Sequence, residues 1–290
     1  MKIAFKLSIA VALSATLLIS AAKVSQAQWQ VPTFKLLNPP RASYAFAFGI
    51  NDSGIVVGSY TDAQGIYRGY IYDGQKYRTI IFPDGSSPTQ ANGVNDSGTV
   101  VGDFIGHDQL THGFMLVGGR FARYDAKPGV STWISGINKA GDVAGYDGND
   151  GNSQGFVKTG PKVTFFTFHG YPTYVFSINA SNTTVGFFIP PPFTASHGFI
   201  RASSGVISQL DYPGSITTNC LGINDAGEVT GLYLDSRNVS HGFTYKNGRF
   251  HASRLPDVAG INNVGSYVGS ITSSSGKTTG YIVTSTAPEP

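Results

Sequence analysis

Three histidines recur at one position of a repeated motif, which raises the question of a metal site. His112, His197 and His241 each stand directly before a glycine and an aromatic residue. Zinc needs its ligands at about 2 Å. If the motif recurs in separate sheets around an axis, equivalent positions two strands from that axis, at about 4.8 Å per strand, place these histidines more than about 10 Å apart. We therefore expect a structural role for them, in packing or hydrogen bonding between sheets, and no metal site.

Two further features have compositions that suggest chemistry. The segment DGNDGNSQ, residues 147–154, has the composition of a calcium loop, but it lacks the alternating ligand spacing and the final glutamate of an EF-hand. Cys220 is the only cysteine and lies in the apolar context NCLGIN, which favours a small core residue over a nucleophile. No Ser-His-Asp or metal triad emerges, so we expect no catalytic residue and no cofactor.

The elements that carry these residues are six copies of one unit. The phrase GINDSGIVVGSY at 49–60 returns as GVNDSGTVVGDF at 93–104 and as GINDAGEVTGLY at 222–233. A glycine stands seven residues after each repeated asparagine, and a glycine–aromatic pair follows 10 to 12 residues later. The asparagines are Asn51, Asn95, Asn138, Asn179, Asn224 and Asn262, and the glycines are Gly58, Gly102, Gly145, Gly186, Gly231 and Gly269.

Each unit is interpreted as four short antiparallel strands. β-Branched and aromatic residues fill the segments between Gly, Asn, Asp and Pro, and no helical period is sustained. Three residues after each repeated asparagine stands a glycine, or Asn182 in the fourth copy, which predicts a hairpin position with positive φ. Four strands in about 43 residues are typical of a propeller blade. The sequence thus predicts an all-β fold, a six-bladed β-propeller of four-stranded blades, with a β-solenoid or a sandwich as alternatives.

The two ends of the repeat region complement each other. The last unit stops at TTGYIV and has no fourth strand, whereas residues 33–51 align with residues 120–138, which run from the fourth strand of the second unit into the third unit. Residues 33–37 are therefore predicted to complete the final blade and to close the ring, because an open array would leave sheet edges exposed. We expect one propeller domain over residues 28–283.

The repeated phrase, with its HGF and GRF continuations, resembles the HAF family of bacterial extracellular repeats over about residues 33–283. His112-Gly113-Phe114 and His241-Gly242-Phe243 match that pattern fully, whereas the third unit has Gln154 in place of the histidine. The resemblance implies an exported repeat protein and assigns no chemistry. The final APEP resembles the start of a bacterial sorting signal, but the apolar span and basic tail of such a signal do not follow it.

The N-terminal segment predicts export. Lys2 and Lys6 precede an apolar run from Leu7 to Ala22, and small residues follow up to Ala27. This is typical of a signal peptide over residues 1–27, with an uncleaved membrane anchor as the alternative. Its removal leaves equal numbers of basic and acidic residues, which argues against nucleic acid or an anionic membrane as partner. We expect a secreted, extracellular or periplasmic monomer without a membrane span in the mature chain, and a disordered tail at 284–290.

A candidate binding site follows from the positions at which the repeats differ. Loops on a rigid scaffold carry function, and the residue five places before each repeated asparagine is expected at the mouth of the propeller on the loop face. Three aromatic rings, two amides and one carboxylate there suit a sugar or another flat polar ligand. This mouth ring is Phe46, Gln90, Trp133, Tyr174, Asn219 and Asp257.

Three functions remain open on the sequence. The first is a non-catalytic propeller that binds a glycan, a small ligand or a partner protein at the cell surface. The second is an extracellular hydrolase or lyase acting on polysaccharide, which needs paired carboxylates, although the mouth ring offers only Asp257. The third is a structural component of a surface matrix, with loop residues such as Phe193 as contact points. The ring residues could also simply fill the channel.

Overall fold

The computed structural model describes residues 33–84, 88–149 and 152–284. All of them belong to one compact unit. The expected signal peptide at 1–27 lies outside the described residues, as does the expected tail except Thr284, which ends the last strand. Within the described part of the chain, no helix is long and apolar enough to cross a membrane.

Twenty-four strands form six four-stranded antiparallel sheets, which we number as blades 1 to 6. Blade 1 comprises β2 (Tyr44–Ile50), β3 (Val56–Thr61), β4 (Tyr67–Tyr72) and β5 (Tyr77–Ile80). Blade 2 comprises β6 (Thr89–Val94), β7 (Val100–Ile105), β8 (Thr111–Val117) and β9 (Arg120–Tyr124). Blade 3 comprises β10 (Thr132–Ile137), β11 (Val143–Asp147), β12 (Gln154–Thr159) and β13 (Lys162–Phe166). Blade 4 comprises β14 (Thr173–Ile178), β15 (Thr184–Phe188), β16 (His197–Arg201) and β17 (Ile207–Gln209). Blade 5 comprises β18 (Thr217–Ile223), β19 (Val229–Leu234), β20 (Ser240–Lys246) and β21 (Arg249–Ala252). Blade 6 comprises β22 (Gly260–Ile261), β23 (Tyr267–Thr272), β24 (Thr278–Thr284) and β1 (Thr33–Leu37).

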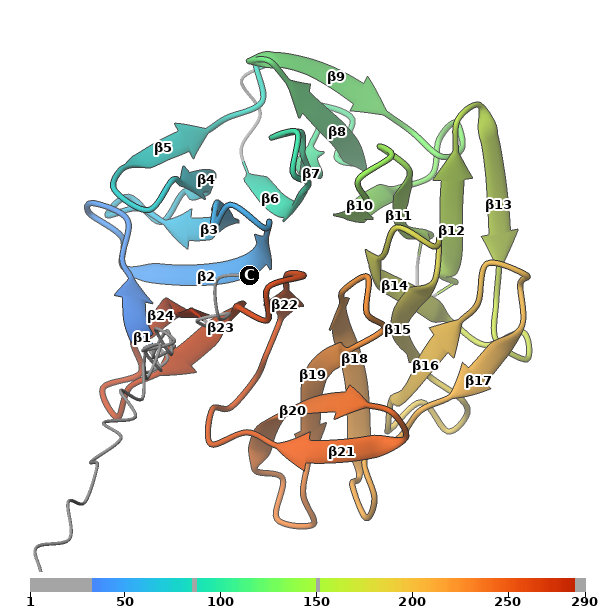
Figure 1. The fold of residues 1–290 in the computed structure, drawn as a ribbon. Coiled ribbons are helices and arrows are strands. Elements are labelled where there is room, and N and C mark those ends of the chain that lie inside the picture. Colours follow the sequence, from blue (N-terminus) through green and yellow to red (C-terminus); the bar gives the residue numbers. More distant parts are fainter. Residues whose placement is uncertain (1–32, 85–87, 150–151, 285–290) are drawn as a thin grey trace, which may run out of the picture. The chain divides into compact units, whose positions relative to one another are not determined.

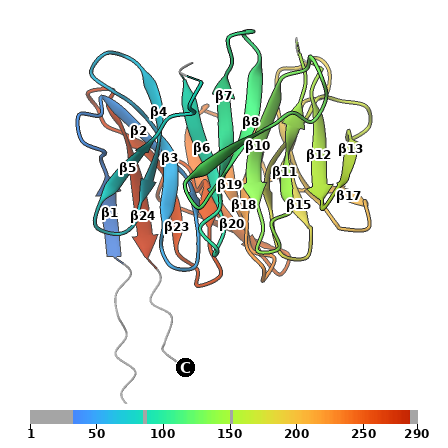
Figure 2. The same cartoon turned by 90° about the horizontal axis from the view of Figure 1, so that it is seen from above.

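The six blades stand in a ring around a central axis (Figure 1). The first strand of each blade lies next to the axis and the fourth lies at the rim, and the view turned by 90° shows the blades side by side around the ring (Figure 2). The six-bladed propeller predicted from the repeats is confirmed.

The ring closes as the sequence predicted. β1 pairs antiparallel with β24, from Thr33 opposite Thr284 to Leu37 opposite Gly280. Leu37 is fully buried and packs with residues of blades 1 and 6. The first described strand of the chain therefore completes the last blade.

The core lies between neighbouring blades. In one cluster, Val57 and Ile80 of blade 1 pack with Ala91, Phe104 and Phe114 of blade 2. The aromatic residue of the glycine–aromatic pair is fully buried in every blade. In blades 1 to 5 it packs in the cluster between its own sheet and the preceding one. These aromatic residues are Tyr70, Phe114, Phe156, Phe199, Phe243 and Tyr281.

The repeated asparagines link the blades in a closed ring of hydrogen bonds. Asn51 Nδ2 donates a hydrogen bond to the carbonyl oxygen of Asn95, and each following asparagine donates in the same way to the asparagine of the next blade. Asn262 Nδ2 closes the ring by donating to the carbonyl oxygen of Asn51, at 2.9 Å. The side-chain oxygen of each asparagine accepts a backbone N–H four residues later, as at Ile55. The six asparagines therefore have a structural role, in the hairpin of their own blade and in the contact with the next blade.

The hairpin that follows each asparagine also has the expected backbone. Gly54 has φ of 79° and Asn182 has φ of 58°. This is the left-handed region, which glycine and asparagine tolerate best.

Candidate functional site

The central channel is lined in rings by side chains of the innermost strands. Three hollows follow one another along it, because neighbouring hollows share lining residues such as Phe48 and Ile50. The first hollow opens on the loop face, where the innermost strands begin. We call it the mouth pocket.

The mouth pocket is a cavity of about 180 Å³. For scale, a cavity of about 150 Å³ holds one benzene molecule, so the pocket has room for a group of one ring. Its lining combines aromatic and polar side chains with a few small residues. The lining residues are Phe46, Ala47, Phe48, Gln90, Asn92, Asp103, Trp133, Ser135, Tyr146, Phe176, Leu221, Asp257, Ala259 and Ser270.

Four residues of the predicted mouth ring line this pocket, namely Phe46, Gln90, Trp133 and Asp257. The other two do not line it. The Tyr174 ring packs edge-on against Tyr146, with centroids 5.1 Å apart, and Asn219 Oδ1 accepts a hydrogen bond from Ser196 Oγ at 2.6 Å. The structure therefore brings four of the six residues together around one cavity.

Several lining residues were not predicted from the sequence, because a β-bulge brings them to the pocket. In β6 the register shifts between Ala91 and Gly93, so that Gln90 lies opposite Asp103. The same shift puts Trp133 opposite Tyr146. Strand pairing thus adds side chains of the second strand to the pocket wall. The added residues, Asp103, Tyr146 and Ser270, each stand directly after the repeated glycine of their blade. The residue type at this position differs from blade to blade, and this is the sequence signal that could have identified them.

The polar wall of the pocket comes from blade 2. Gln90 Nε2 donates to Asn92 Oδ1 at 2.9 Å, and Asn92 Nδ2 donates to Asp103 Oδ2 at 2.6 Å. Asn92 Nδ2 also donates to the carbonyl oxygen of Ile134 in blade 3, at 2.9 Å, which fixes the amide. Burial raises the pKa of Asp103 to about 7, and the Asn92 hydrogen bond only partly opposes that rise.

A second carboxyl enters the pocket from blade 6. Asp257 Oδ1 accepts the backbone N–H of Ser270 at 2.8 Å, and its carbonyl oxygen accepts the hydroxyl of Tyr281. Burial raises the pKa of Asp257 to about 6, against the effect of the Ser270 bond. Both pocket carboxyls therefore hold their protons to higher pH than an exposed aspartate does.

Aromatic rings form the rest of the wall. Trp133 and Tyr146 are stacked with centroids 4.9 Å apart and planes at 15°, and Phe176 lies beside Tyr146 at 6.2 Å. On blade 1, Phe46 and Phe48 are stacked at 6.1 Å and 4°. The pocket thus has aromatic surfaces on blades 1, 3 and 4 and carboxyls on blades 2 and 6.

The channel narrows below the pocket and ends in a smaller hollow of about 70 Å³ on the turn face. An aliphatic ring separates the two ends, formed by Ile50, Val94, Ile137, Ile178, Ile223 and Ile261. On the turn face, Asp52, Asp96 and Asp225 accept backbone N–H groups from the turn of a neighbouring blade. For example, Asp96 Oδ1 accepts the N–H of Asp52 at 2.9 Å.

The repeated histidines are paired with aspartates of their own blade, so the expected hydrogen bonding between blades is wrong for them. His112 Nδ1 lies 2.7 Å from Asp125 and its Nε2 lies 2.9 Å from Asp108. His197 and His241 each contact one aspartate, Asp211 and Asp235 respectively. These contacts tie the third strand to its flanking loops.

Two other candidates of the sequence analysis are structural. In the segment at 147–154, Asn149 Oδ1 accepts the N–H of Ser131 at 3.1 Å. Cys220 is fully buried, and burial raises the pKa of its thiol, so that it stays protonated in the core. Across the described residues there is no cluster of His, Cys, Asp and Glu side chains that could hold a metal ion.

Comparison with known proteins identifies the architecture and no family. No family model matches the chain, and no curated protein matches it in sequence. TolB from Acinetobacter baumannii is similar over 85% of this chain, with a TM-score of 0.55 at 11% identity. The chain spans 65% of the length of that protein.

Two further solved structures are similar to the chain. AofleA from Arthrobotrys oligospora is similar over 88% of this chain and 83% of its own, with a TM-score of 0.51 at 14% identity. A fungal lectin described as a six-bladed β-propeller with a fucose recognition mode, from Aleuria aurantia, aligns over 83% of this chain and 91% of its own, with a TM-score of 0.49 at 12% identity. At these identities the likeness to TolB and AofleA establishes a shared fold alone.

Proposed function

We propose that this protein is an exported, non-catalytic propeller that binds a small polar ligand, such as a sugar residue of a glycan, in the mouth pocket. One observation carries the proposal: a cavity of about 180 Å³ on the axis combines stacked aromatic faces with amide and carboxyl groups held by hydrogen bonds. Ligand sites in proteins have this combination of apolar walls and a few oriented polar groups. Stacking on Trp133 would supply affinity, and the Gln90–Asn92–Asp103 chain would supply orientation.

A glycan array probed with the purified chain tests this function. We expect saturable binding to a subset of sugars, and a loss of about tenfold or more in affinity for Trp133→Ala, because the largest stacking surface of the pocket is removed. Phe193→Ala is the matched control, since Phe193 is an exposed loop aromatic that does not line the pocket. Binding that Phe193→Ala abolishes and Trp133→Ala leaves intact would move the site to the loops and refute the proposal.

A hydrolase or lyase acting on polysaccharide is the second candidate, because the pocket holds two carboxyls where the sequence suggested one. A general acid must carry a proton at the working pH, and the raised pKa values of Asp103 and Asp257 fit that requirement. Release of reducing sugar from an array-positive glycan, abolished in Asp257→Asn while binding persists, would establish catalysis. Binding without turnover supports the first function.

A further inference from the structure

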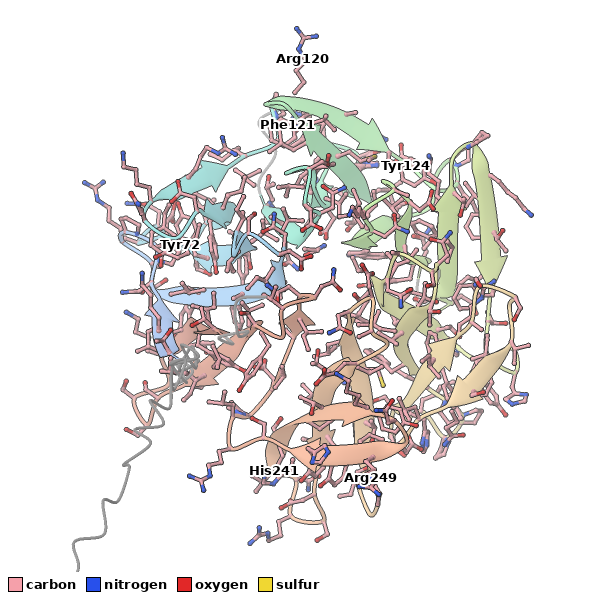
Figure 3. All side chains as sticks on the ribbon, viewed as in Figure 1. Tyr72, Arg120, Phe121, Tyr124, His241 and Arg249 are labelled. Atoms are coloured by element: carbon pink, nitrogen blue, oxygen red, sulfur yellow. The ribbon has the colours of Figure 1, made fainter. Side chains whose placement is uncertain are left out.

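The mouth pocket has two acidic side chains and no basic one among the described residues. Asp103 and Asp257 line it, whereas no lysine, arginine or histidine does so among the residues that the structure describes. Basic side chains lie elsewhere: Arg120 projects outward from β9 (Figure 3), and Lys139 lines the hollow at the other end of the channel. We propose that the mouth pocket selects an organic cation, a compact molecule that presents an ammonium group to these two carboxylates and the surrounding aromatic rings. This inference rests on the proposed function, in that the same pocket must be the ligand site.

Each pocket carboxyl has one oxygen left without a protein partner. Asp103 binds Asn92 through Oδ2, and Asp257 binds Ser270 through Oδ1. Their remaining oxygens, Asp103 Oδ1 and Asp257 Oδ2, have no hydrogen-bond partner within the described residues. Burying a carboxylate without a cation is unfavourable, so a cationic ligand would compensate both groups and a neutral ligand would not.

Two aspartates elsewhere, Asp62 and Asp125, are each paired with a cation of the protein itself. Arg68 Nε lies 2.8 Å from Asp62, and Arg123 Nε lies 2.8 Å from Asp125. The two pocket aspartates therefore differ from them by the absence of a protein cation, as a site for a charged ligand requires.

The aromatic rings of the pocket fit the same class of ligand. A cation over an aromatic face is attracted by the ring quadrupole, most strongly at tryptophan and when water is excluded. At the rim the protein already uses this interaction, with Lys127 Nζ 3.9 Å from the Phe165 ring and Arg201 4.5 Å from the Phe166 ring. In the pocket, Trp133 belongs to blade 3 and Asp257 to blade 6, and these two blades lie on opposite sides of the propeller axis. A bound ammonium between them would contact an aromatic wall and a carboxylate together.

The affinity of the pocket for a cation should also depend on pH, because binding is coupled to the release of protons from Asp103 and Asp257. An ammonium beside Asp103 and Asp257 favours their charged forms and lowers both pKa values, so binding releases protons and strengthens as pH rises through about 6 to about 7. Asn92 and Tyr146 face Asp103, and Ser270 and Tyr281 face Asp257. Neither tyrosine titrates in this range, because burial raises both of their pKa values.

Trp133 provides the readout. The chain has two tryptophans, and Trp29 lies outside the described residues, so Trp29→Phe leaves Trp133 fluorescence as a reporter of the pocket. Two matched pairs of probes are titrated: choline against its neutral isostere 3,3-dimethylbutan-1-ol, and glucosamine against N-acetylglucosamine. We expect each cation to bind at least about tenfold more tightly than its neutral counterpart. The stronger pair tells whether the ammonium is quaternary or belongs to an amino sugar.

The double substitution Asp103→Asn and Asp257→Asn keeps the shape of both side chains and removes their charge. We expect it to abolish the preference for the cation and its pH dependence, with an unchanged circular dichroism spectrum. Asp96→Asn is the matched control, because Asp96 lies at the other end of the channel; it should leave the titrations unchanged.

Two results would overturn the inference. Equal or tighter binding of the neutral probes refutes the cation preference and leaves the mouth pocket as a ligand site. Absence of quenching by all four probes at millimolar concentration also refutes the cation preference, and the glycan array then decides the proposed function separately.

Discussion

Asp103 and Asp62 are the same residue type in opposite environments. Asp103 is desolvated beside the mouth pocket, which raises its pKa to about 7. Asp62 accepts the backbone N–H groups of Gln64 and Ile66 and the guanidinium of Arg68, which lower its pKa. The two carboxyls should therefore make the stability of the protein depend on pH with opposite signs.

For Asp103 the folded state binds the proton more tightly than the unfolded state. The free energy of unfolding thus falls as pH rises from about 4 to about 7, by at most about 4 kcal/mol, and by less where water enters the pocket. Asp103→Asn removes this loss, so the variant should be more stable than the parent at about pH 8 and should show a flatter pH profile. Urea denaturation at several pH values measures the difference.

Asp62→Asn is the control for this experiment. The contribution of Asp62 is present above its unfolded pKa and is lost only as pH falls through its lowered folded pKa. The substitution should therefore destabilise the protein at neutral pH. If both variants gave the same pH profile, the contrast in environment described above would be wrong.

At the scale of the strand, the β-bulge in the innermost strand of a blade explains why the ring of blades was easier to predict from the sequence than the pocket. The repeats identified six hairpins and their turn residues, because these depend on local backbone conformation. A regular hairpin would place Phe104 opposite Gln90, whereas the bulge places Asp103 there. A shift of one residue exchanges the two faces of a strand. No residue pattern in one copy signals that shift, so the second carboxyl was missed.

The bulge also gives the reason for the glycine seven residues after each asparagine. A Cβ atom at Gly145 would lie 1.9 Å from the carbonyl oxygen of Trp133, and the same distance holds at Gly58, Gly102 and Gly186. The sequence analysis recognised that these glycines recur and gave no cause. Their cause is the close approach of two backbones, which only a residue without a side chain permits.

Gly145→Ala should therefore destabilise the protein by at least about 3 kcal/mol, because a backbone atom must move to admit the methyl group. Gly93→Ala is the matched comparison. A Cβ atom there would lie 3.1 Å from the Val101 side chain and 3.2 Å from the carbonyl oxygen of Ser135. These gaps are more than 1 Å longer than the one at Gly145, so small shifts admit the methyl group and we expect a cost of about 1 kcal/mol. Thermal and urea unfolding of the two variants measures this difference. Equal losses would contradict the explanation.

At the scale of the whole molecule, two features hold the six sheets together in one closed ring: the hydrogen bonds between the repeated asparagines and the pairing of β1 with β24. Each blade contacts two neighbours, and the bond from Asn262 to Asn51 joins the last blade to the first. An open array of the same units would leave two unpaired faces and would need capping units. The mouth pocket depends on this closure, since it takes residues from all six blades.

Removal of β1 should open this ring. A chain that begins at Asn38 lacks the buried Leu37 and leaves β24 with an unpaired edge. We expect a loss of at least about 3 kcal/mol in unfolding free energy relative to a chain that begins at Gln30, together with association through the free edge.

A synthetic peptide of residues 30–38 should restore the shortened chain. An extended peptide can add a strand to an exposed sheet edge, and Leu37 of the peptide would refill the core position that the truncation vacates. Titration of the peptide against the shortened chain, followed by thermal unfolding, should raise the midpoint in a saturable way, and a peptide with Leu37→Asp should not. Equal stability of the two chains, or no response to the peptide, would show that closure through β1 does not hold the ring together.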